Sequence, residues 1–250
     1  MANPIVLKIS GHELDDPAYL AEFARVVAEI DVPVIVVHGG GKSISAMQQQ
    51  MGIEPRYMDG VRITDAASLQ VVEMVLRGTV NTMLVRALLA AGIDAQGMSG
   101  VDRGLIKAEK MLHASEDMGF TGVVASVRAD VLEDMLDQGI TPVIAPVCLG
   151  SDSAYNVNAD QVAGAVAAAM DADRLYLISN VAGVLVNGQL ADTLTPERVK
   201  ALIENGTIFG GMIPKVQSAL EALKNGAKQA VITNLEGLKA HGGTVCTASA

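Results

Sequence analysis

The chain has 250 residues, half of them hydrophobic, and a formal net charge of -10. This acidic balance opposes binding to nucleic acid, and the apolar runs are shorter than the about 18 residues of a membrane-spanning helix. With no basic-then-apolar secretion signal and no metal-binding cysteine motif, we expect a cytoplasmic protein that acts on small molecules.

The first predicted element is a buried strand at Ile5–Ile9, followed by a helical pattern over 17–30. Lys8 interrupts the apolar run, which is unusual because an unpaired buried charge is costly. Taken alone, the pattern favours an edge-strand lysine that reaches solvent.

The segment 33–43 combines a β-branched apolar run, three consecutive glycines and the start of a helix. Glycine lets backbone N–H groups approach an anion closely, and the helix N-terminus adds a favourable dipole. The segment is not a Walker A motif, because Val36 stands where that motif needs its first glycine. A phosphate-binding loop is therefore one interpretation, and an ordinary glycine-containing strand-to-helix turn is the other.

The middle of the chain continues the alternation of strands and helices. The dipeptide Asp59-Gly60 predicts a hairpin that leads to Arg62, and Gly78 separates two predicted helices within Ala66–Ala91. The remaining predictions are strands at 95–99, 105–108, 123–127 and 141–146, a mobile flap at 112–122 and a helix at 129–138.

A polar stretch with little helical character precedes the alanine-rich helix predicted at 162–170. It contains Asn156, Asn158 and Asp160. One of these side chains serves as the helix N-cap, but a cap does not require all three. A functional use of the others is the favoured interpretation.

The last third begins with a strand at 174–179 and contains a turn at 186–188 and a helix that starts at Thr195-Pro196. A glycine loop then precedes Lys215 at the start of another helix, and 229–233 is the final core strand. These elements predict two tightly joined lobes, 1–172 and 173–250, in an α/β protein.

Six motifs in register resemble the amino acid kinase family, and their spacing is most similar to its acetylglutamate kinase branch. They are 8–11, 37–41, 62–64, 156–161, 179–184 and 211–215. The resemblance implies a three-layer αβα sandwich around a mainly parallel sheet of about eight strands. It also implies transfer of a phosphoryl group from ATP, with Mg²⁺, to the side-chain carboxylate of N-acetyl-L-glutamate in arginine biosynthesis.

Phosphoryl transfer depends on positioning and on neutralisation of negative charge, which lysines supply. The resemblance implies that Lys8 and Lys215 flank the transferred group and that Asp160 holds both lysines. Substrate would bind to Gly40, Gly41, Arg62 and Asn156. The ATP-binding residues implied are Gly11, Ser179, Asn180, Val181, Ala182, Gly183, Val184, Thr207, Ile208 and Phe209. The metal is expected on ATP oxygens and water, without a protein ligand.

Two departures from the family pattern are Ser10, where a second glycine is usual, and Asn81-Thr82 in place of Asn-Lys. Two alternatives stay open: a kinase for an aminoadipyl or glutamyl group on an acidic carrier protein, and an inactive binding protein of the same fold. We further expect a homodimer formed through the helices within Ala66–Ala91. We expect no inhibition by arginine, because Met1–Pro4 is too short for the extra helix of arginine-sensitive relatives.

Overall fold

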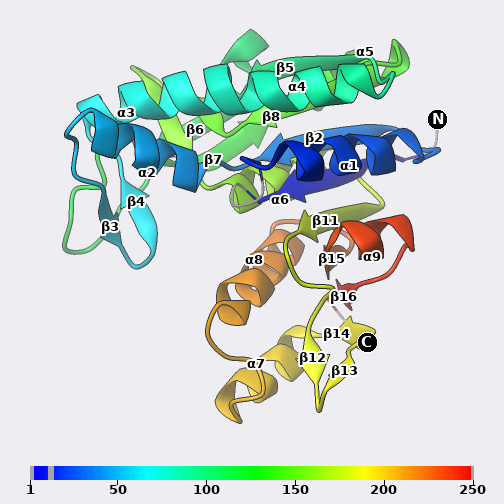
Figure 1. Cartoon of the computed structure of the whole chain (residues 1–250). Helices are drawn as coiled ribbons and strands as arrows, with labels where there is room; N and C mark the ends of the chain where they lie inside the picture. Colours follow the sequence, from blue (N-terminus) through cyan, green and yellow to red (C-terminus); the bar gives the residue numbers. More distant parts are fainter. Residues whose placement is uncertain (1–2, 11–13, 249–250) are drawn as a thin grey trace.

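The computed structural model describes residues 3–10 and 14–248 and is organised around one eight-stranded sheet (Figure 1). The strand order is β14-β16-β15-β11-β1-β2-β8-β5, and every pair is parallel except β15 with β16. This confirms the predicted mainly parallel sheet of about eight strands. Its strands are β1 Ile5–Ile9, β2 Val34–His38, β5 Ala95–Ser99, β8 Thr141–Ala145, β11 Arg174–Ile178, β14 Thr193–Leu194, β15 Ala230–Thr233 and β16 Thr244–Cys246.

Helices cover both faces of the sheet. The layer on one face consists of α1 Pro17–Ala28, α3 Ala66–Val72, η1 Glu73–Val80, α4 Asn81–Ala90 and α9 Leu235–Lys239, with α2 Gly41–Gln50 at its end. The layer on the other face consists of α5 Ala129–Asp137, α6 Ala159–Ala169, α7 Pro196–Glu204 and α8 Met212–Lys224. The predicted αβα sandwich is thereby confirmed, and Figure 1 shows α1 and α4 side by side on one face. No helix within residues 3–10 and 14–248 is long and apolar enough to span a membrane.

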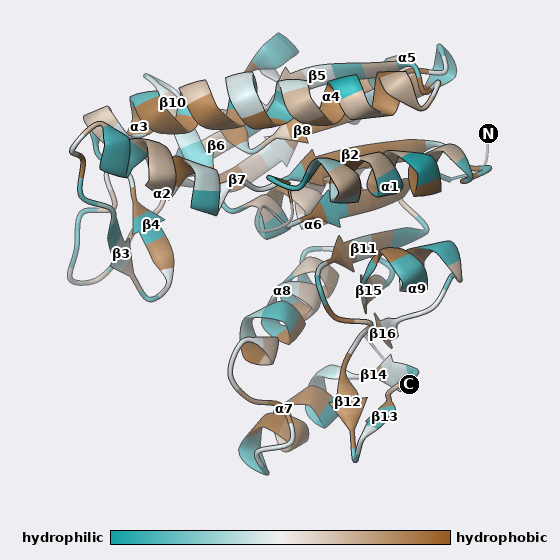
Figure 2. Ribbon diagram, viewed as in Figure 1, coloured by the Kyte–Doolittle hydropathy of each residue, from teal (hydrophilic) through white to brown (hydrophobic). Residues whose placement is uncertain are grey.

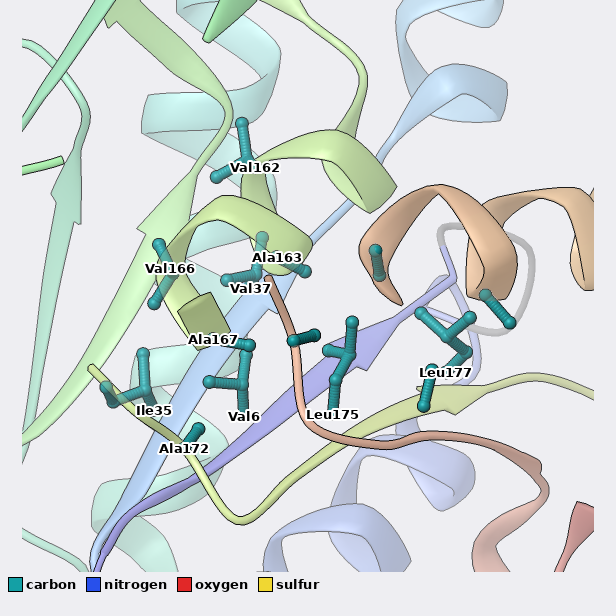
Figure 3. Close-up of a cluster of buried hydrophobic side chains, with 14 of the residues drawn as sticks. Val6, Ile35, Val37, Val162, Ala163, Val166, Ala167, Ala172, Leu175 and Leu177 are labelled. Carbon is teal, nitrogen blue, oxygen red and sulfur yellow. The ribbon is translucent and has the colours of Figure 1, made fainter. Parts of the chain in front are cut away.

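The two faces of β1 belong to different parts of the core, because successive strand side chains point to opposite faces. Val6 packs in the core toward α6 and α8, as Figure 3 shows, whereas Leu7 packs in the core toward α1 and α4. Both faces of the central strands are apolar, as expected of a parallel sheet covered on both sides, and Figure 2 shows these strands as hydrophobic. Lys8 has the same strand parity as Val6 and therefore points toward the α6 layer.

Smaller β elements extend from the sheet. A closed four-stranded unit consists of β6 Ile106–Lys110, β7 Thr121–Val127, β9 Val147–Leu149 and β10 Ala154–Val157. Two hairpins consist of β3 Arg56–Met58 with β4 Val61–Ile63, and β12 Leu185–Val186 with β13 Gln189–Leu190. Asp59 and Gly60 have φ values of 49° and 80°, so the predicted hairpin turn is present. The predicted flap between β6 and β7 contacts the first hairpin through an Arg56–Glu116 ion pair of 2.9 Å.

One local prediction is wrong, and one is incomplete. Gly78 does not separate two helices, because α3, the π-helical segment η1 and α4 follow one another without a gap between Ala66 and Ala90. The polar stretch before α6 has little helical character, as predicted, but it also contains strand β10, which pairs with both β7 and β9. In each case tertiary contacts decide the local structure, and the missing signal lies outside the segment itself.

Candidate active site

The predicted catalytic and substrate-binding residues line two adjoining spaces at the carboxyl ends of β1 and β2. The chain passes from β1 to β2 on one side and places β11 on the other side of β1. Ligands of open α/β sheets bind at such a change of direction, beyond the carboxyl ends of the strands. The start of α2 follows β2, so backbone N–H groups of a helix N-terminus also face this position.

Lys8 forms an ion pair of 2.8 Å with Asp160, in the first turn of α6. The other carboxylate oxygen of Asp160 accepts a hydrogen bond of 2.9 Å from the Ser218 hydroxyl. Both oxygens are therefore held, and the charge of Lys8 is paired at a half-buried position. The alternative of an edge-strand lysine is wrong, because β1 lies in the middle of the sheet.

Asn158 is the N-cap of α6, and its side chain accepts a hydrogen bond of 2.8 Å from the Asp160 N–H. One polar residue of this stretch is thus used for capping, as predicted. The side chains of Asp160 and Asn156 make other contacts instead of capping the helix.

Lys215 lies in the first turn of α8 and lines the same small pocket as Lys8, Ser10, Asp160 and Ser218. The prediction that Asp160 holds both lysines is met for Lys8 only. Within the described part of the chain, Lys215 forms no ion pair with a carboxylate. Ser218, one helical turn further along α8, donates to the second oxygen of Asp160 instead.

A cavity of about 350 Å³ lies beside the glycine loop. Its lining includes all four residues predicted to bind the amino acid substrate, Gly40, Gly41, Arg62 and Asn156. Lys8 and Ser10 line this cavity and the pocket of Lys215, so the two spaces share a wall. Gly11 was predicted to bind ATP but lies outside the described residues.

Arg62 is buried and is held by helix α2. Its guanidinium donates to the Gln48 side chain, to Gly41 O at 3.0 Å and to Ser45 Oγ at 2.8 Å, and lies 4.9 Å from the ring centroid of Tyr57. Burial lowers the pKa of Arg62, and Tyr57 acts in the opposite direction. Arg62 forms no ion pair with a carboxylate of the described residues, which leaves a cationic group in the cavity without a charged partner.

Asn156 lies on β10, and its amide donates a hydrogen bond of 3.0 Å to Thr64 Oγ1. Thr121 Oγ1 donates a hydrogen bond of 2.6 Å to Arg62 O, and it lies 3.1 Å from Thr64 Oγ1. These bonds join the hairpin, β7 and β10 on one wall of the cavity. The orientation of Asn156 is thus set by a buried network.

The predicted nucleotide segments come together in a second cavity of about 430 Å³. It is lined by Val181, Ala182, Gly183, Val184, Leu185, Thr207, Ile208, Phe209 and Met212. Ser179 lines the Lys8 pocket instead, and Asn180 is exposed and lines neither. The Ser179 Oγ is buried without a hydrogen-bond partner in the described part of the chain.

The sequence analysis did not identify Ser218 or Gln48. Ser218 follows Lys215 by three residues on α8 and therefore shares its helix face. Gln48 is fully buried at the position i+4 from Ile44, where an apolar side chain is expected. The helical spacing of each residue is visible in the sequence, but it indicates a role only when the residue that it contacts is known.

The comparisons with known proteins agree with this arrangement. Residues 3–234 match the family model described as the amino acid kinase family. The chain is 52% identical over 243 residues, which are 97% of this chain and 93% of the other, to the acetylglutamate kinase of Roseiflexus sp. (strain RS-1). It is 46% identical to the acetylglutamate kinase of Methanopyrus kandleri, over 96% of this chain and 98% of the other.

A crystal structure of a Streptococcus mutans UA159 protein superposes with a TM-score of 0.82 at 29% sequence identity, covering 100% of both chains. Sequence and fold thus agree over the whole length. The chain belongs to the amino acid kinase family and, within it, to the acetylglutamate kinases.

Proposed function

We propose that the chain transfers the γ-phosphoryl group of ATP to the side-chain carboxylate of N-acetyl-L-glutamate, which yields N-acetyl-L-glutamyl 5-phosphate and ADP in arginine biosynthesis. One observation carries this proposal. Two cations that have no charged partner among the described residues, Arg62 and Lys215, line two adjoining spaces that share Lys8 and Ser10. Because partly buried charges need partners, each space suits an anionic group.

In the reaction, a carboxylate oxygen of the substrate forms a bond to the γ-phosphorus while the bond from that phosphorus to the bridging oxygen of ADP breaks. The carboxylate is already ionised at neutral pH, so no general base is needed. Lys8 and Lys215 stabilise the negative charge on the transferred group, and Asp160 with Ser218 fixes Lys8.

Arg62 and Asn156 orient the amino acid. A guanidinium has five N–H donors, and Gln48, Gly41 and Ser45 accept three, which leaves two for a carboxylate. Asn156 offers an amide for the acetamido group, and Gly40 and Gly41 stand at the N-terminus of α2, where free N–H groups attract anions.

ATP fits the second cavity with its base on apolar side chains and its phosphates toward Lys215 and Ser179. Asp160 is the sole carboxylate among the described lining residues of the Lys215 pocket, and both its oxygens are engaged. Mg²⁺ therefore fits on ATP oxygens and water, where it would neutralise phosphate charge. No group of three or more described His, Cys, Asp or Glu side chains is arranged to hold a metal.

A coupled assay of ADP release tests the function, with N-acetylglutamate, glutamate, aspartate, carbamate and a carrier-bound glutamyl group offered separately. We expect rapid turnover with N-acetylglutamate alone. Equal turnover with free glutamate would contradict the assignment of the acetamido contact, and turnover only with a carrier-bound glutamyl group would contradict the proposed substrate.

We also propose that the enzyme is a cytoplasmic homodimer. Both cysteines are buried and unpaired, which suits a reducing compartment. Met74 and Leu89, each 51% exposed, lie on the α3–η1–α4 run and offer apolar surface for a second copy. Light scattering on the parent and on Leu89→Glu tests the dimer, which we expect the variant to weaken.

The division into lobes at 172/173 also remains a proposal. It places the amino acid cavity before the boundary and the apolar cavity after it.

A further inference from the structure

A buried polar link connects helix α4 to the glycine loop. His38 ends β2 and Asn81 begins α4, and their exposed fractions are 0% and 5%. The Asn81 side-chain amide lies 2.9 Å from Val143 O and 3.0 Å from His38 Nε2. A carbonyl oxygen only accepts hydrogen bonds, so the atom that faces it is Nδ2. Nδ2 therefore donates to both groups, and His38 Nε2 is an acceptor.

The other ring nitrogen of His38 faces the loop. Nδ1 lies 3.0 Å from Gly39 O, which is again an acceptor, so the proton is on Nδ1 and the imidazole is neutral. Burial lowers the pKa of His38 to about 4, which is consistent with this neutral form. The chain of hydrogen bonds thus runs from α4 through the ring to the first residue of the loop.

Asn81 also contacts a third neighbouring strand. It bonds to His38 in β2 and Val143 in β8, and it lies against Gly97 in β5. A Cβ added at Gly97 would lie 2.0 Å from Asn81 Oδ1. Glycine at this position therefore lets the helix come close enough for Asn81 to reach His38.

The same helical run contacts the loop a second time, through apolar atoms. A Cβ added at Gly40 would lie 2.5 Å from Leu76 Cδ2 and 3.4 Å from Val80 Cγ2, both in η1 directly before Asn81. Gly40 also lines the substrate cavity, as does Leu76. The loop is thus packed against the π-helical segment at the wall of the cavity.

We propose that His38 and Asn81 are positioning residues that fix the Gly39–Gly41 loop, and that Gly97 makes this contact possible from outside the cavity. The inference rests on the proposed function, in which Gly40 and Gly41 present N–H groups to substrate. Such donors act by preorganisation, and a misplacement of about 1 Å can cost about a hundredfold in rate. The link to α4 prevents the loop from relaxing when the cavity is empty.

The test compares kcat, KM for N-acetylglutamate and ATP affinity in the full-length parent and its variants. For Asn81→Ala and Gly97→Ala we expect kcat to fall by about tenfold or more, with ATP affinity within about twofold of the parent. Gly97 does not line the substrate cavity, so its effect would pass through Asn81.

Two controls accompany these variants. Gly78→Ala enters open space on the same helical run and should keep parental kinetics. Leu88→Ala removes a fully buried side chain about 10 Å further along α4, so it lowers stability without touching the loop. The proposal would be overturned if the fall in kcat were proportional to the loss of thermal stability, with the same proportion in Leu88→Ala and in Asn81→Ala.

Exchange of one side chain at position 38 gives a further check. His38→Asn keeps a donor toward Gly39 O and should retain at least about tenfold more activity than His38→Leu, which has none. Equal losses in the two variants would overturn the role of the hydrogen bond.

Amide hydrogen exchange of residues 38–42, measured without substrate, separates this inference from the proposed function. We expect faster exchange in Asn81→Ala than in the parent and in Leu88→Ala. A parent that does not phosphorylate N-acetylglutamate would refute the proposed function, while unchanged exchange in Asn81→Ala would refute the positioning role.

Discussion

The two larger cavities of the site differ in their linings. The cavity beside the glycine loop has fixed polar groups among its apolar side chains, such as Arg62 hydrogen-bonded to Gln48 and Asn156 hydrogen-bonded to Thr64. The second cavity is lined mainly by apolar side chains, and Phe209 and Leu185 at its wall are 73% and 57% exposed. A small anion requires donors that are fixed before it binds, because buried polar groups without partners are costly. A heterocyclic base requires mainly apolar surface. We therefore expect substitutions in the first cavity to cost much more than those in the second.

The largest effects are expected where the two spaces meet. Lys8→Ala and Lys215→Ala should each lower kcat by about a hundredfold or more, with a smaller change in KM for N-acetylglutamate, because both lysines act on charge that develops in the transition state. Steady-state kinetics measure this, with Lys224→Ala on the exposed face of α8 as the control. A lysine whose removal leaves kcat nearly intact does not belong to the catalytic set.

Asp160→Asn should lower kcat by about thirtyfold, because it removes the charge that holds Lys8 at 2.8 Å. Asp160 is a positioning residue in this scheme, so its loss should not be repaired by raising the pH. The measurement is kcat between pH 6 and pH 9. Recovery of parental activity at high pH would instead identify Asp160 as a base.

Arg62→Lys tests whether the polar cavity depends on geometry or only on charge. Lysine keeps the positive charge but loses the planar fork, so we expect N-acetylglutamate affinity to fall by about tenfold and ATP affinity to stay unchanged. Separate titrations of the two ligands measure this. Arg56→Lys on the neighbouring strand of the same hairpin is the matched control, because its side chain is 59% exposed. A loss of ATP affinity without a loss of N-acetylglutamate affinity would show that Arg62 does not bind the amino acid substrate.

Much of the fold could be predicted because the central strands are largely apolar runs bounded by polar or glycine-containing segments. The π-helical segment could not, because its Leu76 and Val80 contact Gly40, which lies far away in the sequence. Strand β10 could not either, because it is a short strand within a polar stretch and is stabilised by pairing with β7 and β9. These features depend on contacts between residues far apart in the sequence.

The prediction of the site from sequence is limited in the same way, by contacts between residues far apart in the chain. Lys8 is conspicuous in the sequence because an unpaired buried charge is costly, but only the family resemblance implied that Asp160 is its partner. The contact of Ser218 with Asp160 has no such local sign, because a serine on a helix is ordinary until α6 and α8 are known to pack together. The His38–Asn81 hydrogen bond likewise joins residues separated by 43 positions.

Ser218→Ala should have a moderate effect, a fall of about fivefold in kcat. It removes the hydrogen bond of 2.9 Å to Asp160 but leaves the ion pair with Lys8 in place. Ser218→Thr keeps the hydroxyl and is the matched control for kinetics. A loss as large as that of Asp160→Asn would mean that the hydroxyl itself contacts the phosphoryl group.

Phe209→Ala should have the smallest effect and completes the comparison between the cavities. An exposed aromatic ring at the wall of the apolar cavity can stack on a nucleotide base, which is worth about 1 kcal/mol. ATP affinity should therefore fall by about fivefold, while KM for N-acetylglutamate and thermal stability stay at parental values, because the ring is not part of the core. Isothermal titration with ATP measures the change, and Leu112→Ala, which removes a side chain that is 89% exposed elsewhere, should change neither affinity. A fall in N-acetylglutamate affinity, or unchanged ATP affinity, would show that this cavity does not hold the base.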